Sequence, residues 1–499
     1  MEKNTLAVAA ACVLVLGLAL GDPDKPAAGA KLRLTKRGLG KLSQIASALT
    51  NKHLREFDFS SQKGLPFQVL STRLTAFEPL KVFIQPAPPA GLRFRTRGGL
   101  AQWTAEFNSS KADDESCCNV TVALQDLALD VRAQFRLDPA SGDVGIRQLN
   151  CSVRVGKASV DFEGEGTLAS MLNRVAPRLG RLSRALVKKQ ACAHSGRVMA
   201  RLLDAFVNNA TERLPAPFEA LLFDRRLTAA PISTADYFEL PLLAEIRADD
   251  EAIGSALSRS GAAKPLAESG DLSRMIYFFV SDRSLNSFLY SAHTKGALSF
   301  VADLNALNGT ASPLDEIKAF FLLDCPKGPK KEKVLCVGDL LPEEVKASYQ
   351  DLTYATARFS TTAPPRLTFS EGNAAARADV RVEFLLEAGG PPLLTVDLHS
   401  DAHFDAFVDT TTPRIVGRFS ELRSRVCRVT PSQSRSALEL LGARLGQLDE
   451  LLQQWANSRL AAALPDTDLD TFVVSNPAVR FLDGTLELGF DVDALDLDP

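Results

Sequence analysis

The chain carries the same hydrophobic pattern twice, once in each half of its 499 residues. Strand-like segments of alternating residues lead into a long segment with apolar residues at steps of three and four, and a Leu-Pro pair follows. The first stripe is Leu172, Val175, Leu179, Leu182 and Leu186, and the second is Leu438, Leu441, Leu445, Leu448, Leu452 and Trp455. Such steps place side chains on one face of a helix. The pattern predicts amphipathic helices over 168–213 and 434–463.

Alternation of apolar and polar residues predicts the strands. They fall at 67–83, 92–107, 119–135 and 148–162 in the first half, and at 274–280, 349–360, 379–386, 393–407 and 479–492 in the second. Shorter helices are expected over 38–54, 285–290 and 314–322. The chain is therefore predicted to be an α+β protein with a duplicated plan.

The length exceeds what one hydrophobic core usually supports, so two domains are expected. Residues 1–21 combine Lys3, an apolar run from Leu6 to Leu20 and small residues, which is typical of a secretory signal peptide; a membrane anchor is the alternative. Residues 247–271 are rich in Ala, Ser and charged residues and are predicted to be a linker. This division gives domains over 22–246 and 272–499 and favours an extracellular, secreted protein.

Charge is unevenly distributed, although the total is only −3. Residues 22–240 contain 31 Lys and Arg against 22 Asp and Glu, a net charge of +9, whereas residues 241–499 contain 25 against 37, a net charge of −12. This asymmetry favours contact between the first half and an anionic surface. A solvated surface without a partner explains it equally well.

The candidate glycosylation sites and cysteines are consistent with a secreted protein. Glycosylation sequons at Asn108, Asn119, Asn209 and Asn308 are expected to carry glycan if exposed, whereas Asn150 precedes a cysteine expected in a disulfide. Cys325 and Cys336 flank a Lys- and Pro-rich loop and are predicted to form a disulfide. Cys117, Cys118 and Cys427 are left without an assigned partner; one of the adjacent pair could bond Cys427 or stay free.

Five short stretches resemble, in the same order, the family of bactericidal/permeability-increasing protein, lipopolysaccharide-binding protein and the plasma lipid-transfer proteins. They are PAGLRF at 89–94 with Trp103, LTAAP at 227–231 through Glu239, RMIY at 274–277 with Ser281 and Asp282, GDLLPE at 338–343, and TAPPRL at 362–367 followed by 379–385. The resemblance extends over nearly the whole chain after residue 21.

The resemblance implies two similar barrels, each an antiparallel sheet wrapped on a long amphipathic helix, joined by a central sheet into an elongated boomerang. It also implies a disulfide between Cys151 and Cys192, and an apolar pocket for acyl chains in each barrel. Each buried methylene contributes about 0.8 kcal/mol, so such binding needs no cofactor and no titrating residue. Leu42, Ile45 and Leu49 are predicted to line the first pocket, with ordinary core packing as the alternative.

The leading hypothesis is a secreted lipid-binding protein that sequesters or transfers phospholipid-like ligands. The alternative is an innate-immune binder of bacterial lipopolysaccharide that uses the basic N-terminal half. The family's bactericidal members carry a lysine-rich loop after the position of Trp103, whereas residues 108–116 here are net acidic, which favours lipid transfer. A third possibility is a scaffold that has lost its ligand. A nucleic-acid partner is disfavoured by net acidity and the lack of basic–aromatic motifs.

Two clusters of polar residues are candidate sites. The strand period places Asp397, His399, Asp401, His403 and Asp405 on one face, which could bind a metal ion, although any half-exposed strand alternates in this way and we expect no metal. The first long helix carries basic residues expected to be its solvated face, with lipid phosphate as the alternative partner: Arg174, Arg178, Arg181, Arg184, Lys188 and Lys189. No catalytic motif is present, so an enzyme is not expected.

Overall fold

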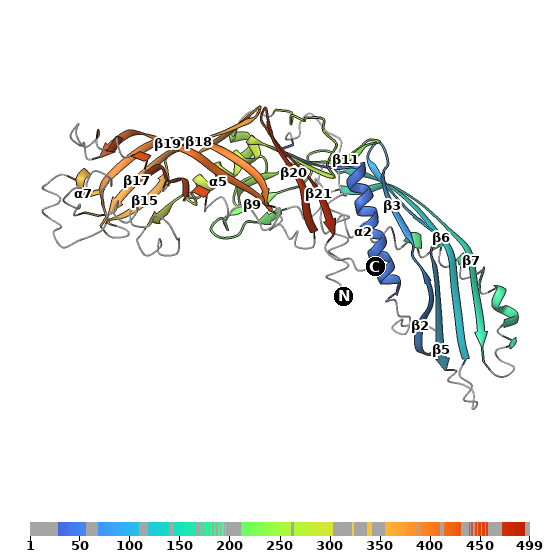
Figure 1. The fold of residues 1–499 in the computed structure, drawn as a ribbon. Coiled ribbons are helices and arrows are strands. Elements are labelled where there is room, and N and C mark those ends of the chain that lie inside the picture. The colour runs from blue at the N-terminus through green and yellow to red at the C-terminus, as the bar shows by residue number, and fades with distance from the viewer. Residues whose placement is uncertain are drawn as a thin grey trace.

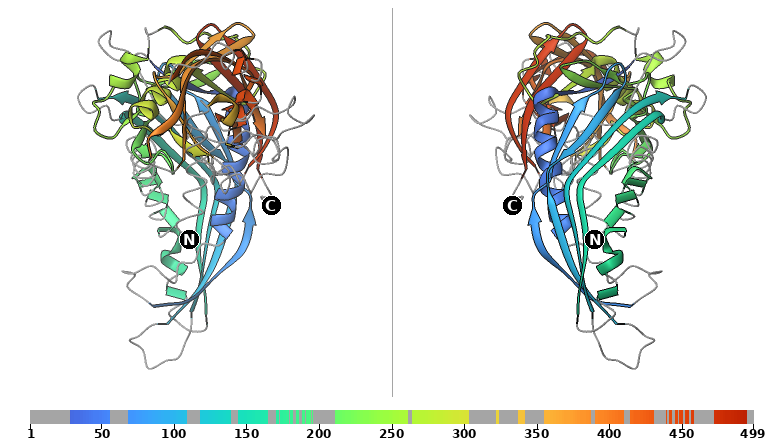
Figure 2. Two further views of the ribbon diagram at one scale, coloured as in Figure 1. Left: turned by 90° about the vertical axis from the view of Figure 1, so that its left-hand side faces the viewer. Right: turned by 90° about the vertical axis from the view of Figure 1, so that its right-hand side faces the viewer.

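The computed structural model describes residues 28–55, 68–108, 118–138, 144–164, 211–260, 264–302, 322–323, 337–341, 355–386, 390–409, 414–430 and 472–494, and some positions within 170–195 and 439–457. The described residues form an elongated, bent molecule (Figures 1 and 2). None of its described helices has the length and hydrophobicity to cross a membrane. The signal peptide predicted over 1–21 lies outside the described residues.

The N-terminal half is built on one curled antiparallel sheet. Its strands are β2 (Gln68–Glu78), β3 (Lys81–Pro86), β4 (Gly91–Arg97), β5 (Leu100–Asn108), β6 (Cys118–Leu137) and β7 (Val144–Glu163). The order is β2-β5-β6-β4-β3, and β7 pairs with the other side of β6. The strand predicted at 92–107 is therefore two strands. They meet at Gly98 and Gly99, whose φ angles of 75° and 91° suit glycine.

The C-terminal half repeats this plan. Its strands are β14 (Phe300–Ala302), β15 (Thr356–Thr361), β16 (Arg366–Ser370), β17 (Asn373–Leu385), β18 (Pro392–Asp409) and β19 (Arg414–Thr430). The order is β14-β15-β17-β18-β19, with β16 paired to β17. β19 was not predicted from the sequence. Glu421 has a positive φ of 49°, and the irregular register there breaks the alternation of period two.

A central sheet combines strands from both halves in the order β10-β11-β1-β13-β21-β20. These strands are β1 (Ala30–Thr35), β10 (Ile232–Ser233), β11 (Tyr237–Leu242), β13 (Ile276–Ser281), β20 (Phe472–Leu482) and β21 (Thr485–Ala494). The single strand predicted at 479–492 is thus a hairpin, because Gly484 supplies a turn with φ 66°. The antiparallel neighbours β1 and β13 occupy the middle of the sheet.

Each middle strand leads directly into a helix. α2 (Lys36–Arg55) follows β1, and α5 (Asp282–Thr294) follows β13. The hydroxyl of Thr35 accepts from the Gly38 amide at 3.3 Å, and that of Ser281 accepts from the Ser284 amide at 3.0 Å. Side-chain oxygens at this position stabilise a helix start. Because β1 and β13 are antiparallel, one helix enters each half (Figure 1).

A smaller sheet of β8 (Thr211–Arg213), β9 (Leu221–Asp224) and β12 (Glu245–Ala248) adjoins α4 (Ser255–Arg259); α7 (Val337–Leu340) lies in the C-terminal half. The described residues of 170–195 are helical, but 211–213 is strand, so the helix predicted over 168–213 is too long. The predicted linker 247–271 includes α4, whose Ala256 and Leu257 are fully buried. The domain boundaries stay a prediction.

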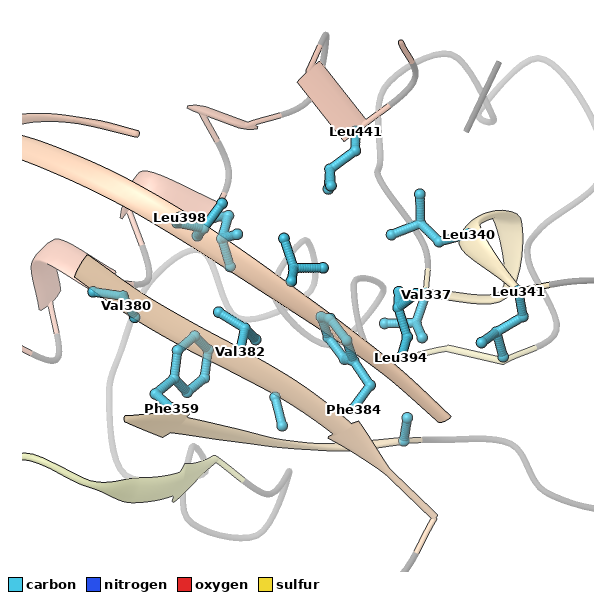
Figure 3. Close-up of a cluster of buried hydrophobic side chains, with 14 of the residues drawn as sticks. Val337, Leu340, Leu341, Phe359, Val380, Val382, Phe384, Leu394, Leu398 and Leu441 are labelled. Carbon is cyan, nitrogen blue, oxygen red and sulfur yellow. The ribbon is translucent and has the colours of Figure 1, made fainter. Parts of the chain in front are cut away.

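The mixed α+β class is confirmed, and most of the described structure is sheet. Each large sheet is curled and open among the described strands, so closed barrels wrapped on a long helix are not shown. One core cluster packs α2 on the first sheet and includes Leu39, Leu42, Ile84, Leu92 and Phe135. A second cluster lies in the C-terminal half, where Val382, Phe384 and Leu398 approach Leu441 (Figure 3).

Candidate functional site

Within the part of the chain that the structure describes, four helices lie along strands in the same way. In each, one asparagine exchanges two hydrogen bonds with the backbone of a single strand residue: Asn51 with Leu80, Asn173 with Phe162, Asn286 with Leu367, and Asn457 with Phe419. An asparagine amide can donate and accept at once, as a neighbouring strand would. The helices therefore take the place of a strand at these positions and satisfy backbone groups that an open edge would expose.

Along β3 the contact extends over two helical turns of α2. Ser43, Ser47 and Asn51 are four residues apart and therefore share one helix face. They accept from the amides of Ile84, Val82 and Leu80 at 2.8, 2.8 and 2.7 Å.

The described positions of 439–457 repeat this arrangement along β19. Asp449, Gln453 and Asn457 are again four residues apart, and they accept from the amides of Ser424, Leu422 and Phe419 at 3.1, 3.2 and 2.7 Å. The second predicted stripe is confirmed where it is described, since Leu441, Leu448 and Leu452 are buried in the core cluster.

The helical residues after β7 are held differently. Asn173 binds Phe162, a Cβ on Gly180 would lie 2.7 Å from the Ala158 carbonyl oxygen, and Cys151 and Cys192 form a disulfide with a Cα separation of 5.7 Å. The disulfide implied by the resemblance is therefore present. These contacts follow β7 backwards, so the helix runs antiparallel to the strand (Figure 2).

Val175, the described member of the first stripe, is not among these contacts. It is 40% exposed and lies about 200° around the helix axis from Asn173. The other four members lie outside the described residues. The described contacts between this helix and the sheet are therefore made by small or polar side chains, and we call them the seam.

An apolar cavity lies in the C-terminal half between the sheet, α5 and the helix along β19. The volume of this cavity is about 120 Å³. Phe288 and Leu289 of α5, Phe419 and Leu422 of β19, and Ala456 contribute to its wall. Its floor consists of two facing pairs of small residues on β17 and β18, which are Ala376 with Ala402 and Ala378 with Ser400.

Small side chains explain why this space is unfilled. On one side of the floor, Val382 and Phe384 belong to the cluster shown in Figure 3, and on the other, Phe369 and Phe404 belong to a separate cluster. Protein interiors are otherwise closely packed, so a strip of alanine and serine between two clusters of large side chains leaves a gap. The cavity follows directly from residue size along two strands.

The rim of the cavity contains a few polar groups. Thr361, Arg366 and Arg377 border it. The Thr361 hydroxyl lies 2.6 Å from Nδ1 of His293, and burial lowers the pKa of that imidazole below its usual value, so the ring is neutral at pH 7. A concave apolar wall with few polar groups at its rim is the form that binding sites for apolar ligands take.

The residues predicted to line the first pocket are placed only in part. Leu42 and Ile45 of α2 are buried, and Leu42 packs in the core cluster on the first sheet. The side chain of Leu49 lies outside the described part of α2. A pocket lined by these residues stays a prediction. The cavity-floor residues were missed, although alternating Ala376, Ala378, Ser400 and Ala402 in otherwise large-residue strands are a readable signal.

The acidic residues of β18 pair with arginines, and its two histidines lie beside acidic residues. Asp397 accepts from Arg381 at 2.7 Å, Asp401 from Arg377 at 3.0 Å, and His399 lies 2.7 Å from Asp379. Asp405 pairs with Arg418 at 3.8 Å, and His403 lies 3.9 Å from Glu421. In the part of the chain that the structure describes, no three His, Cys, Asp or Glu residues are grouped so that they could hold a metal ion.

Other predicted positions are located as follows. Five of the six basic helix residues, Arg174, Arg178, Arg181, Lys188 and Lys189, are exposed, and Arg184 is half-buried. Asn108 ends β5 and Asn119 is half-buried near the start of β6. Cys427 is exposed and free. Asn209, Asn308, Cys117, Cys325 and Cys336 lie outside the described residues.

Comparison with known proteins assigns the family. Residues 219–494 match the sequence profile of the LBP / BPI / CETP family, C-terminal domain. Since this match covers more than half of the chain, the protein belongs to the LBP / BPI / CETP family. No curated protein sequence matches the chain with significance.

The solved structures that resemble this chain include lipopolysaccharide binding protein and two P47 proteins. The crystal structure of lipopolysaccharide binding protein is 16% identical with a TM-score of 0.49, and the match covers 94% of this chain and 100% of that one. P47 of Clostridium botulinum E1 is 9% identical with a TM-score of 0.27, over 94% and 100% of the two chains. P47 from Clostridium botulinum A2 is 10% identical with a TM-score of 0.27, over 93% and 97%.

Proposed function

We propose that this protein is a secreted lipid-binding protein that holds the acyl chains of phospholipid-like molecules under the helices of its two halves. The observation that carries the proposal is the cavity over Ala376, Ala378, Ser400 and Ala402, which lies between two well-packed clusters. An apolar space of this kind gains stability when methylene groups fill it, at about 0.8 kcal/mol for each methylene buried. Membership of the LBP / BPI / CETP family supports a lipid or lipopolysaccharide ligand.

Entry of a long acyl chain requires the cavity to widen. The helix along β19 is attached through the side chains of Asp449, Gln453 and Asn457. Each such hydrogen bond contributes only about 1 kcal/mol net. We therefore propose that this helix moves away from β19 when lipid enters, while α5 and the sheet stay in place. The head group then remains near the polar rim at Thr361.

The second pocket belongs to the same proposal. By analogy with the C-terminal half, it lies between α2, the first sheet and the helix after β7, with Leu42, Ile45 and Leu49 on its wall. The disulfide between Cys151 and Cys192 supports this location, because it fixes the helix at the sheet edge and leaves Val175 of the leucine stripe free of the seam.

Binding of bacterial lipopolysaccharide is a second candidate function. The observation in its favour is the exposed surface of the helix after β7, where Met171 and Val175 are 64% and 40% exposed beside Arg174, Arg178 and Arg181. Exposed apolar and basic side chains on one helix suit an anionic amphiphile. This function uses the outside of the helix, whereas the carrier function uses the space beneath it.

Lipid extraction separates the two functions. Protein purified from a secreting host is examined by native mass spectrometry, and the extracted lipids are identified. The carrier proposal predicts about two phospholipids per chain and uptake of a fluorescent phospholipid by emptied protein. An empty chain that takes up no phospholipid but binds lipopolysaccharide, with affinity lost in R174Q/R178Q/R181Q, would favour the second function.

A further inference from the structure

One of the four floor residues of the C-terminal cavity is polar. Ser400 is 4% exposed, faces Ala378 across the strand pair, and lies two residues from Ala402 on β18. An alanine at this position would leave the same space. A hydroxyl group in an apolar wall costs free energy unless it is hydrogen-bonded. The hydroxyl therefore needs a partner, and that partner determines which of its bonding positions remain for a ligand.

The partner of Ser400 lies on the next strand. Oγ of Ser400 is 2.7 Å from Oγ of Ser424, which is directly opposite in the register of β18 and β19. Ser424 in turn contacts Asp449 of the helix along β19, because its amide donates to an Asp449 oxygen at 3.1 Å. Burial raises the pKa of Asp449, and the hydroxyl and amide of Ser424 oppose this rise. The three side chains thus form a polar chain from the cavity floor to the helix.

The direction of the hydrogen bonds follows from the acid at the end of this chain. When Asp449 is ionised it can only accept, so the Ser424 hydroxyl donates to it and its oxygen accepts from Ser400. A hydroxyl group has one hydrogen and two acceptor positions. In the described part of the chain, Ser424 is the side-chain partner of Ser400, and it takes the hydrogen of Ser400. Ser400 therefore presents acceptor positions to the cavity.

The other polar side chains of the cavity wall are engaged elsewhere. Arg366 and Arg377 are paired in the register of β16 and β17, and both are exposed, so their guanidinium groups reach solvent. Thr361 lies at the rim, where its hydroxyl contacts His293. Among the described residues, Ser400 is consequently the polar side chain on an otherwise apolar floor.

We propose that Ser400 is a specificity-determining residue, and that the C-terminal cavity prefers an apolar chain with a hydroxyl group on it to a plain hydrocarbon chain. The ligand hydroxyl donates to the free acceptor position of Ser400, which a plain chain leaves without a partner. A hydrogen bond of this kind changes affinity by about two- to tenfold. This inference rests on the proposed lipid function and concerns which lipid the cavity selects.

The test compares three fatty acids as competitors for a bound fluorescent phospholipid: stearic acid and its analogues with a hydroxyl or a keto group in mid-chain. The hydroxy acid can donate, whereas the keto acid can only accept. We expect the full-length protein to bind the hydroxy acid about two- to tenfold more tightly than the other two. Any binding in the N-terminal half is the same in all variants below, so differences between variants report the C-terminal cavity.

Ser400→Ala should abolish this preference without weakening the binding of stearic acid. The matched control is Ser420→Ala, which removes a hydroxyl that donates to Asp405 at 2.8 Å on the outer face, and it should keep the preference. Ser424→Ala gives a readout that a merely structural role would not produce. It frees the hydrogen of Ser400, so the keto acid gains a donor and its affinity should approach that of the hydroxy acid.

Thermal melting confirms that each variant is folded. Equal affinities for the hydroxy acid and stearic acid in the wild type would overturn the inference and leave the carrier function intact. A preference that survives Ser400→Ala would do the same. Protein that binds none of the three acids and no phospholipid would overturn both proposals.

Discussion

The helices that follow β7 and β19 are attached to their strands in opposite ways. The helix after β7 is held by a disulfide, a close glycine contact and Asn173, while Val175 of its apolar stripe is exposed. The helix along β19 has four side-chain hydrogen bonds, and Leu441, Leu448 and Leu452 are buried in the core. The described members of the two stripes therefore differ: Leu448 and Leu452 are buried in the core, whereas Val175 is 40% exposed.

The difference implies unequal mobility. A disulfide keeps two elements together whatever happens around it, whereas hydrogen bonds and apolar contacts can be exchanged for contacts with a ligand. We therefore expect the C-terminal helix to yield when its cavity fills and the N-terminal helix to stay at β7. Each of the following predictions tests one part of this contrast.

Loss of the disulfide should have the largest effect. Replacing Cys151 and Cys192 with serine opens a cross-link between residues 41 positions apart, which lowers the free energy of unfolding by about 3–4 kcal/mol in the chain-entropy model. Denaturant unfolding monitored in the N-terminal half measures this loss. Cys427→Ser is the control, because Cys427 is exposed and free, and a comparable loss there would contradict the assignment.

Truncation of a leucine in the second stripe should have the next largest effect on the free energy of unfolding. Leu448 is 1% exposed, so Leu448→Ala should lower the free energy of unfolding by about 2–4 kcal/mol. Val175→Ala in the first stripe should change it by less than about 0.5 kcal/mol, because Val175 is 40% exposed. Urea midpoints of the two variants give the comparison. Similar costs at both positions would show that the stripes play the same part.

Loss of an asparagine contact should lower the free energy of unfolding by a smaller amount. Asn457→Ala leaves the amide and carbonyl of Phe419 without their partner in a half-buried place, which should cost about 1–2 kcal/mol. Asn173 is exposed, so water can replace it, and Asn173→Ala should cost less. Hydrogen exchange at the amides of Phe419 and Phe162 reports each contact separately. Faster exchange at Phe162 than at Phe419 in the respective variants would reverse the expected order.

The smallest effect is expected from Asp449, which lies on the helix along β19 and has a shifted pKa. Burial raises the pKa of Asp449 above its ordinary 3.8, and one of its oxygens has no described partner. A raised pKa in the folded state means that stability is present at low pH and lost as pH rises through that pKa. Asp449→Asn should therefore stabilise the protein at pH 7 by up to about 1 kcal/mol, with the gain vanishing near pH 3.8. Melting temperatures of Asp449→Asn and of the wild type across this pH range show whether the substitution stabilises the protein.

Much of the fold could be predicted from periodicity. The helix expected over 38–54 is α2 at Lys36–Arg55, and the strand at 119–135 is β6 at Cys118–Leu137. The errors have local causes, namely glycine turns that divide strands and the irregular register at Glu421 that hid β19. The strand-like use of Asn51, Asn173, Asn286 and Asn457 was missed, because polar residues on a helix look solvated until the partner strand is known.

The candidate site was predicted less well than the fold. Leu42 and Ile45 are large and periodic, and a pocket that they line stays a prediction. The described cavity lies over Ala376, Ala378, Ser400 and Ala402, where small residues alternate. Sequence reasoning that searches for small residues on the inner face of long strands, in addition to leucine stripes, would have located it.

The most direct test of the account is to fill this cavity and measure bound lipid. In Ala378→Phe, an aromatic ring occupies the floor of the cavity, whereas in the control Ala375→Phe the ring is placed on the opposite face of the same strand. We predict that native mass spectrometry finds one fewer phospholipid per chain in Ala378→Phe than in wild type or Ala375→Phe, with all three folded. Equal lipid content in all three proteins would contradict the claim that the cavity over β17 and β18 holds an acyl chain.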